Sequence, residues 1–138
     1  KNRQRNSSIM SESFNLEIIS PSKTLIQSEA LEVLIPAFEG DITFLKNHIS
    51  FVTFLRPGIL EVKKENEVEK FYVEEGTVEF SKNNLLILSS TVKNLKEISK
   101  ENVIKMIDDA KKNIANDETN DKEKYQLSHK IDTLENIN

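Results

Sequence analysis

The sequence of 138 residues contains no cysteine, and only two histidines, three glycines and three prolines. Without cysteine, the chain can form neither a disulfide nor a thiolate metal site, and it has no cysteine nucleophile. With so little glycine, it contains neither a P-loop nor a Gly-x-Gly-x-x-Gly pattern. No serine lies in a nucleophile elbow. We therefore expect a chain that is not an enzyme and that holds no cofactor and no metal.

Long apolar runs and an excess of basic charge are missing as well. The longest apolar runs span a few residues, such as 85–88, far short of the roughly 18 that a membrane span needs. The 19 basic and 23 acidic residues are interspersed and give a net charge of −4, so no basic stripe for nucleic acid is visible. We expect no nucleic-acid binding and no direct membrane insertion. Work at a membrane would go through partner proteins.

The chain divides into two parts of different composition. All the glycine, proline and phenylalanine residues lie within the first 80 positions, together with short segments in which apolar and polar residues alternate, as strands require. These segments are 14–18, 31–35, 41–45, 51–55, 60–62, 68–74, 77–82 and 85–91. Residues 56–58 indicate a type II turn, and residues 64–67 a polar hairpin tip. We predict an antiparallel β-sandwich of about eight to ten short strands over residues 14–97.

After residue 97 the apolar period becomes helical. Val103, Ile107, Ala110 and Ile114 follow a 4-3-4 spacing that places them on one helix face, and Ile104 is expected to widen this stripe. Ser99 is the expected N-cap. A looser second stripe runs from residue 125 to residue 137, after a break at residues 116–117. We predict a two-helix hairpin over residues 98–138, which makes the fold mainly β plus α. The polar residues 1–13 are expected to be a disordered tail, with a transit-peptide remnant as the alternative.

Several segments, in order, resemble the epsilon subunit of F-type ATP synthase, which is called delta in mitochondria. Residues 16–21 are similar to the opening strand of that family. Residues 36–41, with Glu39-Gly40-Asp41, resemble its P-x-x-E-G-(D/E) segment, and residues 55–58 its L-K-P-G turn. Residues 71–80 resemble a further strand pair, with Glu74-Glu75 in place of Ser-Gly. The resemblance runs from about residue 14 to the C-terminus, and the order of the segments carries it.

This resemblance implies a non-catalytic rotor subunit that binds the gamma shaft, sits on the ring of c subunits and passes rotation to the catalytic head. Gamma would bind an outward apolar face of the sandwich. Glu39, Asp41 and His48 would lie on the ring-facing end, although residues 43–50 keep only Phe44 and His48 of the family's G-(I/V)-x-P-x-H-A-P segment. The implied location is the cytoplasmic face of a bacterial inner membrane, or else the matrix side of the mitochondrial one.

In some members of this family the helices inhibit ATP hydrolysis, and an (I/L)-D-x-x-R-A pattern binds ATP. Here Ser99 and Asn102 stand at the Asp and Arg positions, so the charged pair that would hold a nucleotide is missing. We expect no tight ATP binding. Lysines of the hairpin could meet acidic surface on the catalytic alpha and beta subunits, or form a solvated face: Lys105, Lys111, Lys112, Lys122, Lys124 and Lys130.

Other interpretations stay open at this point. The same architecture would suit an adaptor or binding module of another protein complex. An enzyme has no residues to name in this sequence. His129, on the expected second helix, is interpreted as a solvated surface residue, and Glu74-Glu75 as a hairpin tip.

Overall fold

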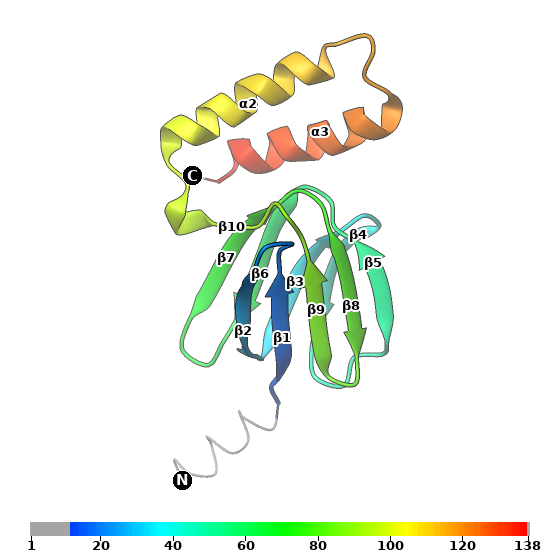
Figure 1. The fold of residues 1–138 in the computed structure, drawn as a ribbon, viewed down its shortest axis with the longest axis vertical. Coiled ribbons are helices and arrows are strands. Elements are labelled where there is room, and N and C mark those ends of the chain that lie inside the picture. Colours follow the sequence, from blue (N-terminus) through cyan, green and yellow to red (C-terminus); the bar gives the residue numbers. More distant parts are fainter. Residues whose placement is uncertain (1–11, 138) are drawn as a thin grey trace.

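The computed structural model describes residues 12–137, so most of the expected N-terminal tail lies outside the described residues. Two five-stranded sheets face each other and are followed by two helices (Figure 1). In the first sheet the strands lie in the order β2 (Thr24–Ala30), β1 (Phe14–Ile19), β9 (Asn84–Leu88), β8 (Thr77–Ser81) and β5 (Phe51–Phe54). In the second sheet the order is β10 (Lys93–Asn94), β7 (Val68–Val73), β6 (Gly58–Lys63), β3 (Glu32–Ala37) and β4 (Gly40–Phe44). The predicted sandwich and helical hairpin are confirmed.

The core of the sandwich comes from the alternation that the sequence shows. Every second residue of a strand points between the sheets, and these residues form one buried apolar cluster that includes Leu16, Ile35, Val62, Phe80 and Ile87. Burial of this apolar surface is the main contribution to the stability of the sandwich. The polar ends of the strands meet in short turns, such as residues 64–67, where the Lys64 amide donates to the Glu67 carbonyl at 2.8 Å.

Two features of the sheets and one turn differ from the sequence expectation. Strand β2 was not predicted, and β1 runs parallel to β9 while it is antiparallel to β2. The turn at residues 56–58 is not of type II, because Gly58 does not have the positive φ that this turn requires at its third position. Glycine is needed there for space, since a Cβ at Gly58 would lie 2.5 Å from the Pro36 Cβ.

The helical part begins with a short 3-10 turn, η1 (Leu95–Glu97), and continues with α2 (Lys100–Ile114) and α3 (Asp121–Glu135). Ser99 caps α2 as predicted, because its hydroxyl accepts a hydrogen bond from the Asn102 amide at 3.1 Å. The cap of α3 is Asn120, outside the predicted break at residues 116–117. Ile104 was assigned wrongly to the buried stripe, since its side chain is 64% exposed and Met106 packs inward in its place.

A second apolar cluster joins the hairpin to the second sheet. Tyr72 points outward from β7 and lies opposite Ile59 of β6, yet it is fully buried because Val103 of α2 and Leu134 of α3 cover it. The stripes of the two helices therefore bury against each other and against the sandwich. Helices of 15 residues are marginal alone in water, so this cluster is what holds them in place.

Candidate functional site

Helix α3 lies across one end of the sandwich, which we call the hairpin end (Figure 1). Its C-terminal half reaches the second sheet, where the Thr133 hydroxyl donates to the Pro57 carbonyl at 3.4 Å. Its N-terminal half reaches the turn at residues 38–39 between β3 and β4, where the Tyr125 hydroxyl donates to the Phe38 carbonyl at 3.1 Å. Helix α2 packs on α3. The contacts of α3 therefore determine whether the hairpin stays on the sandwich.

Glu39 and Asp41 lie at the hairpin end, in the β3–β4 turn and at the start of β4. The Thr53 hydroxyl donates a hydrogen bond to the Glu39 carboxylate. This bond and one from the backbone of Glu39 hold the pKa of Glu39 below its ordinary value. Asp41 forms an ion pair with Arg56, with 2.9 Å between Oδ1 and Nη2. Both carboxylates are exposed at the surface and held in place by neighbouring strands.

His48 lies at the opposite end, which we call the far end. The loop 45–50 leaves β4 there, and the Asn47 amide donates to the Asn83 side chain in the β8–β9 turn at 2.6 Å. The His48 ring packs on Phe44 and Phe80, with centroids 4.7 and 5.6 Å apart. The structure thus does not bring the three predicted site residues together. The expectation of one shared end is corrected, because the length of β4 separates Asp41 from His48.

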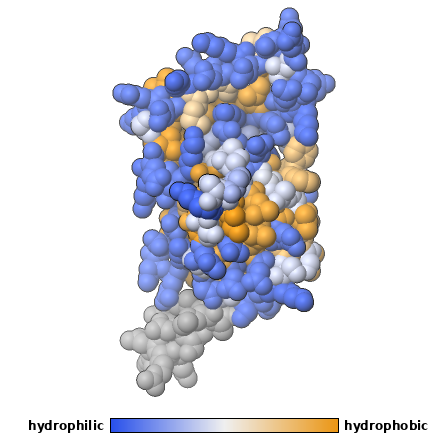
Figure 2. Space-filling view, viewed as in Figure 1, coloured by the Kyte–Doolittle hydropathy of each residue, from blue (hydrophilic) through white to orange (hydrophobic). Residues whose placement is uncertain are grey.

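The outer face of the first sheet carries an apolar surface that we call the apolar face, made of the half-buried Ile19 and the exposed Val52, Phe54 and Leu88. The strand register aligns it, since Phe54 lies opposite Thr77, Thr77 opposite Leu88, and Leu88 opposite Ile19. Val52 and Phe54 are 66% and 62% exposed. Figure 2 shows hydrophobic surface gathered on this side of the molecule, below the helices. Surfaces of this kind mark protein interfaces.

No residue of the apolar face was predicted from the sequence, although a signal was present. In residues 51–55 both phases of the alternation are apolar, so the strand must show apolar side chains on both faces. Beside this face lies a groove of about 880 Å³, with Phe54 and Leu88 along the sheet and Lys122 and Gln126 on α3. A partner seated on the apolar face would therefore also meet α3.

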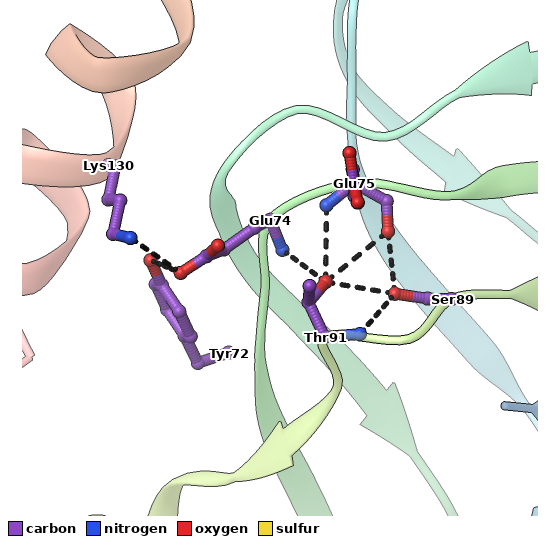
Figure 3. Close-up of polar contacts among 6 residues, drawn as sticks. All are labelled: Tyr72, Glu74, Glu75, Ser89, Thr91 and Lys130. Carbon is purple, nitrogen blue, oxygen red and sulfur yellow. Dashed lines mark hydrogen bonds and ion pairs between the residues drawn. The ribbon is translucent and has the colours of Figure 1, made fainter.

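A polar network fixes the β7–β8 turn and reaches the hairpin (Figure 3). The Thr91 hydroxyl accepts hydrogen bonds from the amides of Glu74 and Glu75 at 3.0 and 3.2 Å. The Glu74 carboxylate accepts a hydrogen bond from the Tyr72 hydroxyl at 2.9 Å and forms an ion pair with Lys130 of α3 at 3.0 Å. Burial and the neighbouring Glu74 carboxylate raise the pKa of the Tyr72 hydroxyl. Glu74 and Glu75 do not form the predicted hairpin tip, because they lie in the connection from β7 of the second sheet to β8 of the first sheet, and these two strands do not pair. Glu74 also binds the helix.

His129 is not the solvated residue that the sequence indicated. It is partly buried on the sandwich side of α3, and its ring packs edge-on against Tyr125 with centroids 4.5 Å apart. Burial lowers the pKa of His129 below its ordinary value, and the nearby Arg56 guanidinium lowers it further. The carboxylates of Asp132 and Asp41 act in the opposite direction. His129 therefore faces the same charged pair that lies beneath the helix.

The remaining sequence candidates are placed as follows. Ser99 and Asn102, at the two nucleotide-motif positions, form the N-cap of α2. Of the six lysines, Lys130 pairs with Glu74, and Lys111 pairs with Glu135 across the hairpin at 3.2 Å. Among residues 12–137, no group of three or more acidic or histidine side chains is arranged to hold a metal ion. No helix in the same range is both long and apolar enough to cross a membrane.

The described residues form a β-sandwich with a C-terminal helical hairpin and an exposed apolar face. Residues 13–94 match the family model described as the ATP synthase delta/epsilon chain β-sandwich domain. The ATP synthase epsilon chain of Pelagibacter ubique is 41% identical over 130 residues, which is 94% of this chain and 100% of the relative. That of Sinorhizobium fredii is 41% identical over 68 residues, about half of each chain. The chain therefore belongs to the ATP synthase epsilon-chain family, whose members are non-catalytic subunits of the complex.

Solved structures show the same fold. A chain in the structure of Euglena gracilis mitochondrial ATP synthase, OSCP/F1/c-ring, has a TM-score of 0.71 at 21% identity, over 89% of this chain and 78% of that one. A chain of the Tetrahymena thermophila mitochondrial ATP synthase central stalk and c-ring has a TM-score of 0.59 at 16% identity. The resemblance drawn from the sequence motifs is confirmed.

Proposed function

We propose that this chain is a rotor-stalk subunit of a rotary ATP synthase, which couples rotation of the c-ring to ATP synthesis in the catalytic head. Its task is adhesion and rigidity, because a stalk transmits torque through closely packed contacts. The observation that carries the proposal is the apolar face of the first sheet, which leaves Val52 and Phe54 exposed on a stiff, well-packed sandwich. The epsilon-chain relative aligned over its whole length supports the same function.

The gamma subunit is the partner proposed for the apolar face. Aromatic side chains at the centre of an interface contribute most to binding, and losing one costs about 2 kcal/mol or more, roughly thirtyfold in affinity. Phe54 lies in the apolar row across the first sheet and is held by the β5–β8 ladder. It points away from the core, so a polar substitution there leaves the packing of the sandwich intact.

The test is co-purification and binding of gamma with Phe54→Asp and Val52→Asp variants. The matched control is Ile104→Asp, because Ile104 is equally exposed but lies on α2, away from the apolar face. We expect the two β5 variants to lose gamma binding and the control to keep it. Equal gamma binding by all three variants would show that gamma binds outside the apolar face. No gamma binding by the unaltered chain would overturn the proposal and favour the alternative, an adaptor module of another complex.

For the c-ring contact we propose the exposed carboxylates at the hairpin end, Glu39 and Asp41. The ring-facing role predicted for His48 is not carried further, because its ring is engaged with Phe44 and Phe80 at the far end. Asp41→Lys in reconstituted enzyme should reduce coupled proton pumping. Arg56→Gln is the control, since it breaks the same ion pair but keeps the Asp41 charge. If both variants pump normally, the ring contact lies elsewhere.

We further propose that the hairpin inhibits ATP hydrolysis when it leaves the sandwich, with its lysines meeting acidic surface on the catalytic subunits. The exposed lysines Lys105, Lys112, Lys122 and Lys124 are available in the docked form, whereas Lys130 must first leave Glu74. We also propose a peripheral location at the cytoplasmic face of a bacterial inner membrane, where a rotor-stalk subunit of a bacterial ATP synthase would work. The bacterial relatives support this location.

A further inference from the structure

We infer that Tyr125 makes α3 a clamp on the β3–β4 turn, so that docking of the hairpin and the order of this turn are linked. Only the last step, that the turn meets the c-ring, rests on the proposed function. The N-terminal half of α3 passes over residues 38–39 at the hairpin end and contacts the turn there.

The sandwich by itself supports this turn from one side. Strand β4 is the edge of the second sheet and pairs only with β3 within the described residues. The turn has two residues, and Gly40 after it takes a φ of 136°, which favours glycine. The sandwich holds the turn through the Phe38 amide, which donates to the Phe54 carbonyl at 2.8 Å. The Thr53–Glu39 hydrogen bond and the Arg56–Asp41 ion pair complete that support.

Helix α3 supports the turn from the other side. The Tyr125 hydroxyl binds the Phe38 carbonyl, and the two rings pack with centroids 5.1 Å apart and planes tilted by 47°. The Tyr125 ring is itself positioned by His129, one helical turn further on. Both contacts of Tyr125, the hydrogen bond and the ring packing, are made to Phe38 in the turn. They persist only while the hairpin is docked.

Two elements that stabilise each other do so reciprocally. Release of α3 therefore loosens the β3–β4 turn, and any partner that orders the turn favours the docked hairpin. If that partner is the c-ring, the ring contact and the position of the hairpin are coupled through Tyr125. Tyr125 acts in this scheme as a positioning residue and contacts no partner.

Amide hydrogen exchange on the isolated full chain tests the clamp. The reporter is the Phe38 amide together with residues 40–42, read beside the amides of α3. Tyr125→Phe removes the hydroxyl but keeps the ring, and we expect exchange of the reporter to rise about fivefold, as for one net hydrogen bond. Tyr125→Ala should raise it further. The control is Ser128→Ala, because Ser128 is exposed on the same helix and should leave the turn unchanged.

The reciprocal variant is Phe38→Ala, which removes the ring contact but keeps the backbone carbonyl that accepts the Tyr125 hydroxyl. It should accelerate exchange in α3, by a smaller factor than that by which Tyr125→Ala accelerates exchange in the turn. Unchanged exchange of the turn in both Tyr125 variants would overturn the inference, whether or not α3 stays docked. The experiment needs neither gamma nor the c-ring. A clamp without any effect of Asp41→Lys on pumping would therefore refute the ring contact alone.

Discussion

Removal of the Glu74 carboxylate should weaken the docking of the hairpin. Its carboxylate accepts both the Tyr72 hydroxyl and the Lys130 ammonium, so it joins a fully buried residue of the sandwich to α3 (Figure 3). We compare Glu74→Ala, which removes the shared acceptor, with Lys130→Met, which removes only the ion pair. The difference between them measures the value of the hydrogen bond to Tyr72.

The magnitudes follow from burial. In Glu74→Ala the hydroxyl of Tyr72 loses its acceptor where water does not reach it, and a buried group without a partner costs about 1–3 kcal/mol. In Lys130→Met the lost pair has side chains that are 23% and 28% exposed, which places it near the upper end of the ~0–1 kcal/mol range of surface pairs. We therefore expect Glu74→Ala to destabilise the protein by about 2 kcal/mol and Lys130→Met by about 0.7 kcal/mol.

Urea unfolding measures these changes in the free energy of unfolding, provided that the variants share the same dependence of that free energy on urea concentration. The double variant measures the coupling between Glu74 and Lys130. Because Glu74→Ala already removes the pair, the double variant should cost less than the sum by about 0.7 kcal/mol. The control is the Lys111–Glu135 pair, whose side chains are 55% and 48% exposed and whose loss should cost less than about 0.5 kcal/mol. Equal costs for Glu74→Ala and Lys130→Met would refute the reasoning.

Three further predictions concern other parts of the chain. Because the pKa of His129 is lowered in the docked form, first by burial, docking is fully stable above the ordinary histidine pKa and weakens as pH falls below it; fluorescence transfer between dyes on α2 and the first sheet should show this loss as pH falls below about 6.5, and His129→Gln should abolish the pH dependence. Gly76→Ala should destabilise the sandwich by about 2–4 kcal/mol in urea unfolding, since Gly76 has a φ of 152° and a Cβ there would lie 2.3 Å from the Leu88 carbonyl oxygen. Gly40→Ala is the control and should cost clearly less, because Gly40 has a φ of 136° but open space around the new Cβ. A larger cost for Gly40→Ala than for Gly76→Ala would contradict the steric argument. ATP should not bind with micromolar affinity in isothermal titration, because Ser99 and Asn102 cap α2 and carry no charge; a micromolar affinity would show that other residues supply the site.

Alternation predicted the strands that are buried on one side, and it failed where burial is weak. Strand β2 is an edge strand in which only Ala30 is buried, so its residues carry little periodic signal. The parallel pairing of β1 with β9 joins segments about 70 residues apart, and no local pattern specifies such a partner. Ile104 lies next to the buried stripe in sequence, but α2 turns Met106 toward the sheet in its place.

In the candidate site, too, local sequence patterns predicted some features and missed others. Asp41 and His48 are seven positions apart, and a loop would keep them together. Residues 41–44 belong to β4 and extend by about 3.3 Å each before the loop that holds His48 begins, which carries the two side chains to opposite ends. The partners of α3 could not be predicted either, because Tyr125 and His129 meet residues of the sandwich that are about 70 to 90 positions away. What could be predicted was the class of protein, since turn residues at fixed offsets carried the resemblance.

The outward position of Tyr72 has a consequence for the subunit before assembly. When the hairpin leaves, Tyr72 and Ile59 on the second sheet become accessible, while the apolar face on the first sheet is already open. A free chain in that state would show adhesive surface on both sides of the sandwich and would tend to aggregate. The docked hairpin therefore shields the outer apolar side chains of the second sheet from water. In the released form, other proteins must cover the exposed Tyr72 and Ile59 if aggregation is to be avoided.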